Sequence, residues 1–186
     1  MTSKFSTRNR LIVAGATAAV VGAGVVGVVT VQAADPDPAT RTPVVVEAAD
    51  NNLATSTHLS VAAATKAAQT ALDAATKENQ RVSVAVVDRN GNVIVTLRGD
   101  GAGPQSYDAA QQKAFTSVSW NAPTSELTER LESAPHLADI DGTLFLGGGA
   151  PVKSKGAPIA GIGVAGAPSG DLDEKFARAG VAALGN

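Results

Sequence analysis

A β-hairpin signal in the middle of the chain constrains the fold more than any other feature. Two short runs rich in β-branched residues, 81–87 and 93–98, flank the dipeptide Asn90-Gly91. Asn-Gly between such runs is typical of the tight turn that joins two antiparallel strands. The sequence therefore predicts that the fold contains an antiparallel sheet.

A glycine-rich region nearer the C-terminus predicts the remaining strands. The segments 142–152 and 158–168 combine short apolar runs with glycine loops and carry no obvious catalytic residue. Because glycine lets another backbone or a flat ligand approach closely, this region indicates a binding recess before it indicates catalysis. We expect strands near 143–146, 151–153 and 159–164. With the hairpin, they make a sheet of about five antiparallel strands.

Helices are predicted on both sides of these strands. Ser60 can N-cap an alanine-rich helix over 61–77, because a serine side chain can accept a hydrogen bond from a free N–H in the first turn. Further helices are expected over 106–119, from Thr124, and from Ser169 or Asp171 to about Leu184. This order of elements predicts an α+β fold, a sheet flanked by helices.

The first 34 residues are typical of an export signal. A basic start is followed by an uncharged apolar run, 11–31, and by the small-residue cleavage site Val31-Gln32-Ala33. The alternative is an uncleaved membrane anchor, for which the apolar run is long enough. We expect residues 1–34 to be a signal peptide, 35–57 a flexible linker and 58–186 the folded domain of a secreted or surface-tethered protein.

Charge and cysteine content exclude several functions. Residues 1–34 hold three of the 15 Lys and Arg residues and none of the 17 acidic ones, so the remainder carries a net charge of about −5. A net negative charge disfavours binding to nucleic acid. Because the chain has no cysteine, disulfide, thiol and cysteine-based zinc chemistry are excluded.

No catalytic motif stands out. The run 161–166 matches G-x-G-x-x-G, but no strand and acidic ribose ligand can follow it before the chain ends at Asn186, so its glycines are interpreted as structural. The histidines, His58 and His136, lie outside any nucleophile motif. The sequence therefore offers no candidate catalytic set.

Aromatic and basic residues give two readings of a ligand site. Trp120 and its aromatic neighbours either fill the core or wall a flat apolar ligand. Arg98 and Lys113 either contact the carboxylates of such a ligand or are surface cations. The sequence leaves these alternatives open.

Five motifs in order resemble the GlcG/HbpS family of small α/β proteins. The exported leader and the segment 99–120 resemble in particular the actinobacterial extracellular haem-binding branch of that family. The likeness covers nearly all of 58–184, and its motifs are 84–91, 98–103, 113–116, 147–151 and 161–166.

The resemblance implies a profilin-like fold with a five-stranded antiparallel sheet, and haem bound at subunit surfaces. It also implies a homo-oligomer, an octamer in that branch, that senses haem together with a membrane sensor histidine kinase. The haem iron would be near Thr143, which matches a threonine ligand of the branch, and near His58, which precedes the first helix. Arg98 or Lys113 would lie near the propionates.

A free-iron site is also implied, but with a changed donor set. The branch has an acidic E-x-x-E pair at the start of its second helix, where this chain has Asp108 and Gln111. Asp108 can still act as a metal ligand, whereas Gln111 lacks the charge. We therefore expect a weaker iron site than that of the branch.

Three hypotheses follow from the sequence. The leading one is a secreted haem-binding protein that captures or senses haem and iron-linked oxidative stress. The second is an enzyme that degrades haem or handles a corrinoid. The third is a secreted structural or partner-binding module without a cofactor, which is consistent with the absence of a catalytic set.

Overall fold

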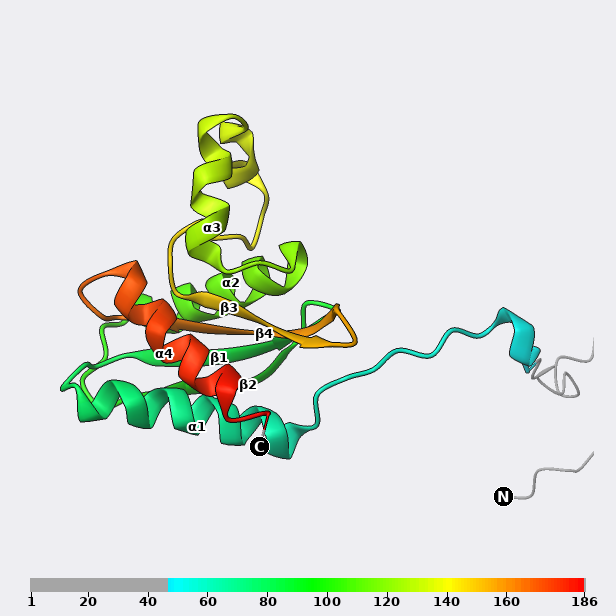
Figure 1. The fold of residues 1–186 in the computed structure, drawn as a ribbon, viewed down its shortest axis with the longest axis horizontal. Coiled ribbons are helices and arrows are strands. Elements are labelled where there is room, and N and C mark those ends of the chain that lie inside the picture. The colour runs from blue at the N-terminus through cyan, green and yellow to red at the C-terminus, as the bar shows by residue number, and fades with distance from the viewer. Residues whose placement is uncertain (1–46, 186) are drawn as a thin grey trace, which may run out of the picture. The chain divides into compact units, whose positions relative to one another are not determined.

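A computed structural model describes residues 47–185, which form an α+β domain built on one antiparallel sheet (Figure 1). Its strands run in the order β2-β1-β4-β3, and every neighbouring pair is antiparallel. The strands are β1 (Ser83–Asp88), β2 (Val93–Arg98), β3 (Gly149–Ser154) and β4 (Ala157–Ala165). The helices are α1 (Val61–Lys77), α2 (Gln105–Trp120), α3 (Thr124–Thr128) and α4 (Gly170–Ala182), with short 3-10 turns η2 (Asp50–Asn52), η3 (Glu129–Glu132) and η4 (Pro135–Asp139).

The predicted α+β class is confirmed, but the expected fifth strand is wrong. Residues 143–146 form no strand, because two of their amides bind elsewhere. The N–H of Thr143 donates to Ile140 O, and the N–H of Leu144 donates to the Thr116 hydroxyl. This segment is therefore fixed to α2 instead of being added to the sheet.

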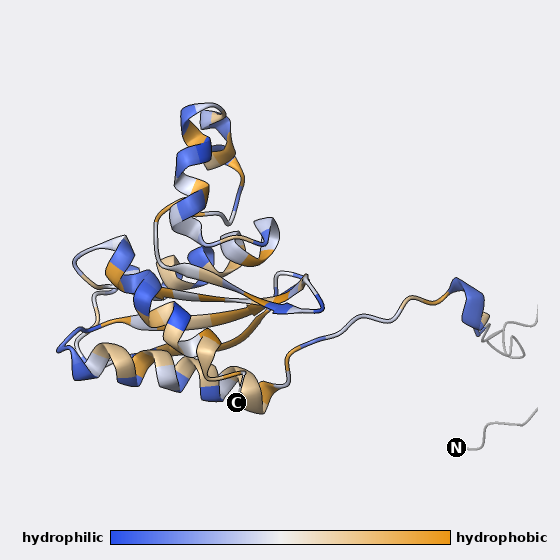
Figure 2. Cartoon of the chain, in the orientation of Figure 1, coloured by the Kyte–Doolittle hydropathy of each residue, from blue (hydrophilic) through white to orange (hydrophobic). Residues whose placement is uncertain are grey.

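One face of the sheet is covered by α1 and α4 (Figure 1). Ser60 caps α1, as predicted, by accepting from the N–H of Ala63. The alanine face of α1 packs on valines of β1 and on Phe176 of α4, all of them buried. Because alanine is small, the helices approach closely, and Gly180 of α4 lies against the backbone of Ala67. Figure 2 shows hydrophobic colours concentrated on the strands that these helices cover.

The opposite face is covered by α2, which lies almost directly on β4. A Cβ at Gly161 would overlap the carbonyl oxygen of Ala114, and one at Gly163 would overlap that of Ala110. Glycine is required here because the helix backbone occupies the space of a side chain. The structure thus gives the glycines of the G-x-G-x-x-G run a packing role.

The predicted hairpin is present, and a second hairpin joins β3 to β4. Gly91 takes φ 87° in the turn between β1 and β2, while Lys155 and Gly156 take φ 51° and 81° between β3 and β4. Positive φ at both central residues, as at Lys155 and Gly156, is typical of the tight two-residue turn that matches strand twist, whereas the β1–β2 turn has positive φ at Gly91 and not at Asn90.

The predicted signal peptide lies outside the described residues. Within the described part of the expected linker, residues 49–57 are exposed and include η2. Among the residues that the structure describes, no helix is both long and apolar enough to cross a membrane.

Candidate functional site

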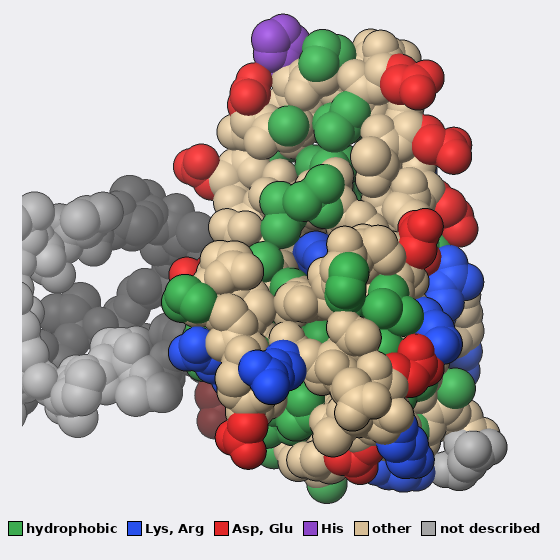
Figure 3. Space-filling view, turned by 90° about the vertical axis from the view of Figure 1, so that its left-hand side faces the viewer, with side chains coloured by type: hydrophobic (Ala, Val, Ile, Leu, Met, Phe, Trp, Pro, Cys, Tyr) green, Lys and Arg blue, Asp and Glu red, His purple; other side chains and the backbone are tan. Residues whose placement is uncertain are grey.

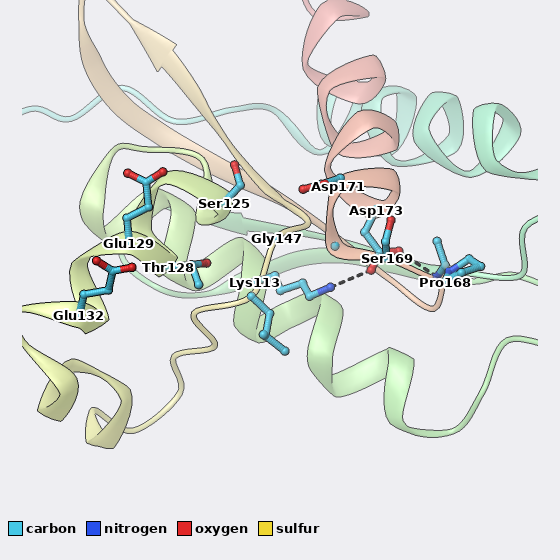
Figure 4. Close-up of a pocket in the computed structure, with 13 residues that line it drawn as sticks. Lys113, Ser125, Thr128, Glu129, Glu132, Gly147, Pro168, Ser169, Asp171 and Asp173 are labelled. Atoms are coloured by element: carbon cyan, nitrogen blue, oxygen red, sulfur yellow. Dashed lines mark hydrogen bonds and ion pairs between the residues drawn. The ribbon is translucent and has the colours of Figure 1, made fainter.

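Two pockets adjoin α2. The larger, here called the lysine pocket, has a volume of about 620 Å³ and lies between α2, α3 and the start of α4 (Figure 4). The smaller, here called the hairpin pocket, has a volume of about 290 Å³. The hairpin pocket is lined by Val87, Gly91, Val93, Gln111, Gln112, Phe115 and Gly142.

A buried ion pair forms the floor of the lysine pocket. Lys113 Nζ donates to Asp173 Oδ2 at 2.8 Å and to Val164 O at 3.2 Å, and the two side chains are only 6% and 4% exposed. Burial raises the pKa of Asp173, although the hydrogen bond and charge of Lys113 oppose that shift. The ammonium of Lys113 is thus largely neutralised by Asp173.

The neighbouring carboxylate of Glu174 joins α4 to α3. It accepts from the Ser125 N–H at 3.0 Å, from the Ser125 hydroxyl at 2.9 Å and from Arg178 at 2.7 Å. Burial alone would raise the pKa of Glu174, but the hydrogen bonds from Arg178 and Ser125 outweigh it and hold the pKa below its ordinary value. Glu174 therefore acts as a structural link.

The rim of the lysine pocket is acidic. Glu129, Glu132 and Asp171 stand around its opening with exposed side chains (Figure 4). Figure 3 shows acidic side chains along both margins of this face, with hydrophobic side chains in a band between them. Because Asp173 already balances Lys113, the pocket disfavours an anionic ligand.

The hairpin pocket has a different chemistry. Its lining is mainly apolar, from Val87, Val93 and the ring of Phe115, with glycines at the turn and at Gly142. Val93 is 47% exposed, which is high for a large apolar side chain on a strand. This surface is an open apolar shelf that suits a flat ligand.

Gly142 lines the hairpin pocket, and Thr143 is the next residue in the chain. Its hydroxyl donates to Ile140 O at 2.7 Å, which leaves oxygen lone pairs available as an acceptor or metal ligand. The segment is held in place because Leu144 N–H donates to Thr116 of α2 at 2.8 Å. Thr143 is therefore fixed beside the shelf.

His58 lies before α1, and its charge acts on the hairpin turn. Its Nε2 is 2.7 Å from Ser56 Oγ, and the side chain is exposed. Burial would raise the pKa of Asp88, but hydrogen bonds from Asn92 and Asn90 and the charge of His58 hold it below its ordinary value. The structure thus brings His58 to the end of the sheet that carries the turn, where Gly91 also lines the hairpin pocket.

Other predicted site residues lie farther apart. Arg98 is at the opposite end of the hairpin, where its guanidinium donates to Ala102 O at 2.6 Å. Trp120, at the end of α2, packs edge-on against Phe145 with ring centroids 5.2 Å apart. Lys113 is buried, so the reading of it as a surface cation is wrong. The ligand-binding roles of these residues stay predictions.

Asp108, the predicted iron ligand, is exposed in the first turn of α2. In the described part of the chain, no three His, Cys, Asp or Glu side chains gather where they could hold a metal ion. Gln111, which replaces an acid of the related motif, is half-buried and lines the hairpin pocket instead.

Several residues of these pockets were not identified from the sequence. Asp173 and Glu174 have the charge expected near the start of any helix, yet both are buried and make tertiary contacts. Their partners lie 60 and 49 residues away. Contacts between residues so far apart in the sequence leave no local sequence pattern. Gln112, which lines the hairpin pocket, gave no signal because glutamine is common on exposed helix faces.

Comparison with known proteins identifies relatives over most of the domain. Residues 59–182 match the family model described as "Haem degrading protein HbpS-like". A double-mutant form of Streptomyces reticuli HbpS has a crystal structure that is 70% identical, with a TM-score of 0.75, over 76% of this chain and 97% of that one. The crystal structure of a PduOC:heme complex is 26% identical, with a TM-score of 0.63, over 68% of this chain and 95% of that one.

A curated relative is larger than this domain. The corrinoid adenosyltransferase PduO of Citrobacter freundii is 30% identical over 108 residues, or 55% of this chain. The match spans about a third of that protein, 32% of its length. The family match covers more than half of the present chain, and its fold agrees with that of HbpS. The chain belongs to the HbpS-like family.

Proposed function

We propose that this protein binds haem and that the hairpin pocket, with Thr143 beside it, is the site. The family description names haem, and a relative of the same fold is titled as a haem complex. The observation in this chain that carries the proposal is the apolar shelf of Val87, Val93 and Phe115 next to a fixed threonine hydroxyl.

The residues present fit this cofactor. A porphyrin has a large flat apolar face, which the shelf can cover, and an iron that accepts oxygen or nitrogen ligands. Thr143 offers a hydroxyl oxygen, while His58 offers an imidazole at the same end of the sheet. Bound haem would supply a redox-active iron at the protein surface.

The lysine pocket is the poorer site for haem, although it is larger. Its carboxylates Glu129, Glu132 and Asp171 would face the two negative propionates, and Lys113 is already paired. Two like charges about 4 Å apart cost about 1 kcal/mol even in water. Charge therefore supports the hairpin pocket over the lysine pocket as the proposed site.

Hemin titration tests the proposal. The purified protein should give a saturable shift of the Soret band, and Thr143→Ala should change its position and weaken binding. Thr128→Ala is the matched control, because Thr128 lines the lysine pocket. A wild-type protein that behaves like an unrelated control protein would disprove haem binding, whereas loss of binding in Thr128→Ala alone would move the site to the lysine pocket.

Haem degradation is a second candidate function, since the family description itself names degradation. Loss of the Soret band together with iron release, under peroxide or a reductant, would establish it. A spectrum that stays constant would leave capture or sensing of haem as the function. Binding of a corrinoid, which the similarity to PduO raises, is tested by the same titration with cobalamin in place of hemin.

We propose further that the protein acts outside the cytoplasm, where it reports haem and iron-linked oxidative stress to a membrane sensor kinase. The support is the signal-like sequence of residues 1–34. Fractionation of cells that produce the full chain should place a protein shortened by about 34 residues in the medium or on the surface. A full-length protein in the cytoplasm would overturn this part of the proposal.

A further inference from the structure

The two edges of the sheet differ in how they are protected. A β-strand at an edge presents unpaired N–H and C=O groups, and proteins usually block such edges against pairing with other strands. Here β3 forms one edge and β2 forms the other. An edge that is not blocked can pair with a strand of another chain.

The β3 edge is blocked by three local devices. The N–H of Gly149 donates to the Thr124 hydroxyl at 2.7 Å, so it is not available to another strand. Pro151 has no N–H to donate. Lys153 then adds an exposed charge to the strand. A strand that approached β3 would lose hydrogen bonds and meet this charge.

The β2 edge has no proline, and its single charge, Arg98, is at the end of the strand, whose sequence is Val-Ile-Val-Thr-Leu-Arg. Among the described residues, the backbone of β2 forms its ladder with β1 alone. Its side chains are half-buried or exposed throughout, as expected for an apolar strand that lacks a second neighbour.

The ladder with β1 shows which groups of β2 point outward. Just beyond the end of β2, the N–H of Gly99 donates to Val82 O. Because hydrogen-bonding groups alternate along an antiparallel strand, Leu97 and Val95 face β1, and Thr96 faces away from it. Thr96 therefore presents a free N–H and C=O near the middle of the open edge.

We propose that β2 pairs antiparallel with β2 of a second copy of this chain, with Thr96 of the two copies opposite each other at the two-fold axis. The two four-stranded sheets then become one continuous sheet. The Thr96 hydroxyl, which is shielded from solvent and has no hydrogen-bond partner within the described residues, gains one in its counterpart after rotation about χ1. Threonine pairs across strands form such hydrogen bonds.

The charge pattern fits a second copy in this register. Arg98 of one strand lies opposite Ile94 of the other, so the two Arg98 residues are separated along the strands by four positions, or about 13 Å. The centre of the interface is uncharged. A parallel arrangement would instead bring the two arginines side by side, which like charges disfavour. Self-pairing is thus compatible only with the antiparallel register.

A cysteine crosslink tests this geometry directly, because the chain has no cysteine of its own. Directly opposed residues that share hydrogen bonds have Cα atoms about 5.5 Å apart, within the range a disulfide spans. Under mild oxidation, Thr96→Cys should form a covalent dimer that a reductant reverses. Lys153→Cys, on the blocked β3 edge, is the control and should remain mostly uncrosslinked.

A backbone variant gives an independent measurement. Thr96→Pro removes an outward N–H without removing a bond to β1, as proline can on an edge strand. Its mass by light scattering should fall at least twofold, with an unchanged far-ultraviolet circular dichroism spectrum. Equal crosslinking of Thr96→Cys and Lys153→Cys, or an unchanged mass in a folded Thr96→Pro variant, would overturn the proposed interface.

Discussion

Lys113 and Asp173 form an ion pair of 2.8 Å that ties α2 to α4 across the end of the sheet. Both side chains are almost completely buried, so neither charge is stabilised by water when the other is missing. The pair is extended by backbone groups, since Asp173 also accepts from the Ala167 N–H at 2.9 Å. The pair therefore fixes the loop between β4 and α4 as well as the two helices.

Replacing one member of this pair should destabilise the fold strongly. Lys113→Met leaves the Asp173 carboxylate buried without its cation, and breaking a buried pair in this way costs about 3–5 kcal/mol. The double variant Lys113→Met/Asp173→Asn should recover part of the loss, because no buried charge remains. Urea unfolding measures both variants. Lys175→Met is the control, since its pair with Glu78 is exposed and worth about 0–1 kcal/mol.

Glu174 predicts a dependence of stability on pH. Its folded-state pKa is lowered below the ordinary value of 4.5, so its ionised form stabilises the fold above that pH. This contribution is lost as the pH falls through the lowered pKa. Glu174→Gln should therefore reduce the melting temperature at pH 7, and the gap between variant and wild type should narrow below pH 4.5. A gap that is constant over this range would contradict a role for the carboxylate charge.

Asp173 acts in the opposite direction in the wild-type protein. Because burial raises its folded-state pKa above 3.8, the folded state binds this proton more tightly than the unfolded state does. Its contribution is therefore most favourable below pH 3.8 and is lost as the pH rises through the folded-state pKa. The double variant Lys113→Met/Asp173→Asn, which leaves neither buried charge, should remove that dependence, as thermal melts between pH 3 and pH 7 would show. A slope equal to that of the wild type would exclude this assignment.

Local signals predicted the parts of the fold that depend on neighbouring residues. Asn90-Gly91 specified its hairpin, and Ser60 capped its helix, because a turn or a cap needs a few adjacent residues. The strand expected at 143–146 is absent for the opposite reason. The apolar pattern of these residues is that of a strand, but the Thr116 hydroxyl, 28 residues away from Leu144, takes up an amide that a strand would need.

The candidate site was predicted less completely. Thr143 and His58 were named from motifs, and the structure places them at the same end of the sheet. Lys113 was named as a ligand residue, but its burial depends on Asp173, which follows 60 residues later and belongs to another helix. Composition and spacing do not report such pairings, because they arise only when α2 and α4 pack on the sheet.

The contact of α2 with β4 predicts that the glycines of β4 tolerate no side chain. Gly163→Ala would place a Cβ on the carbonyl oxygen of Ala110 and against the N–H of Ala114. Since backbone atoms cannot move aside cheaply, we expect a loss of about 1–3 kcal/mol or more in urea unfolding. Gly185→Ala is the control, because its nearest neighbour would be 3.7 Å away. Equal stability of the two variants would show that α2 shifts without cost.

The hairpin pocket predicts that added negative charge weakens hemin binding. Gln112→Glu keeps the size of the side chain but places a carboxylate in the lining, where it would repel the negative charge of a haem held in this pocket. A repulsion of about 1 kcal/mol at contact distance corresponds to about fivefold weaker binding. Gln105→Glu is the matched control on the same helix, because Gln105 is exposed and outside the pocket lining. Titration at low and high salt separates the causes: screening should shrink the difference between Gln112→Glu and wild type if charge is responsible. An affinity of Gln112→Glu equal to that of Gln105→Glu would place the haem elsewhere.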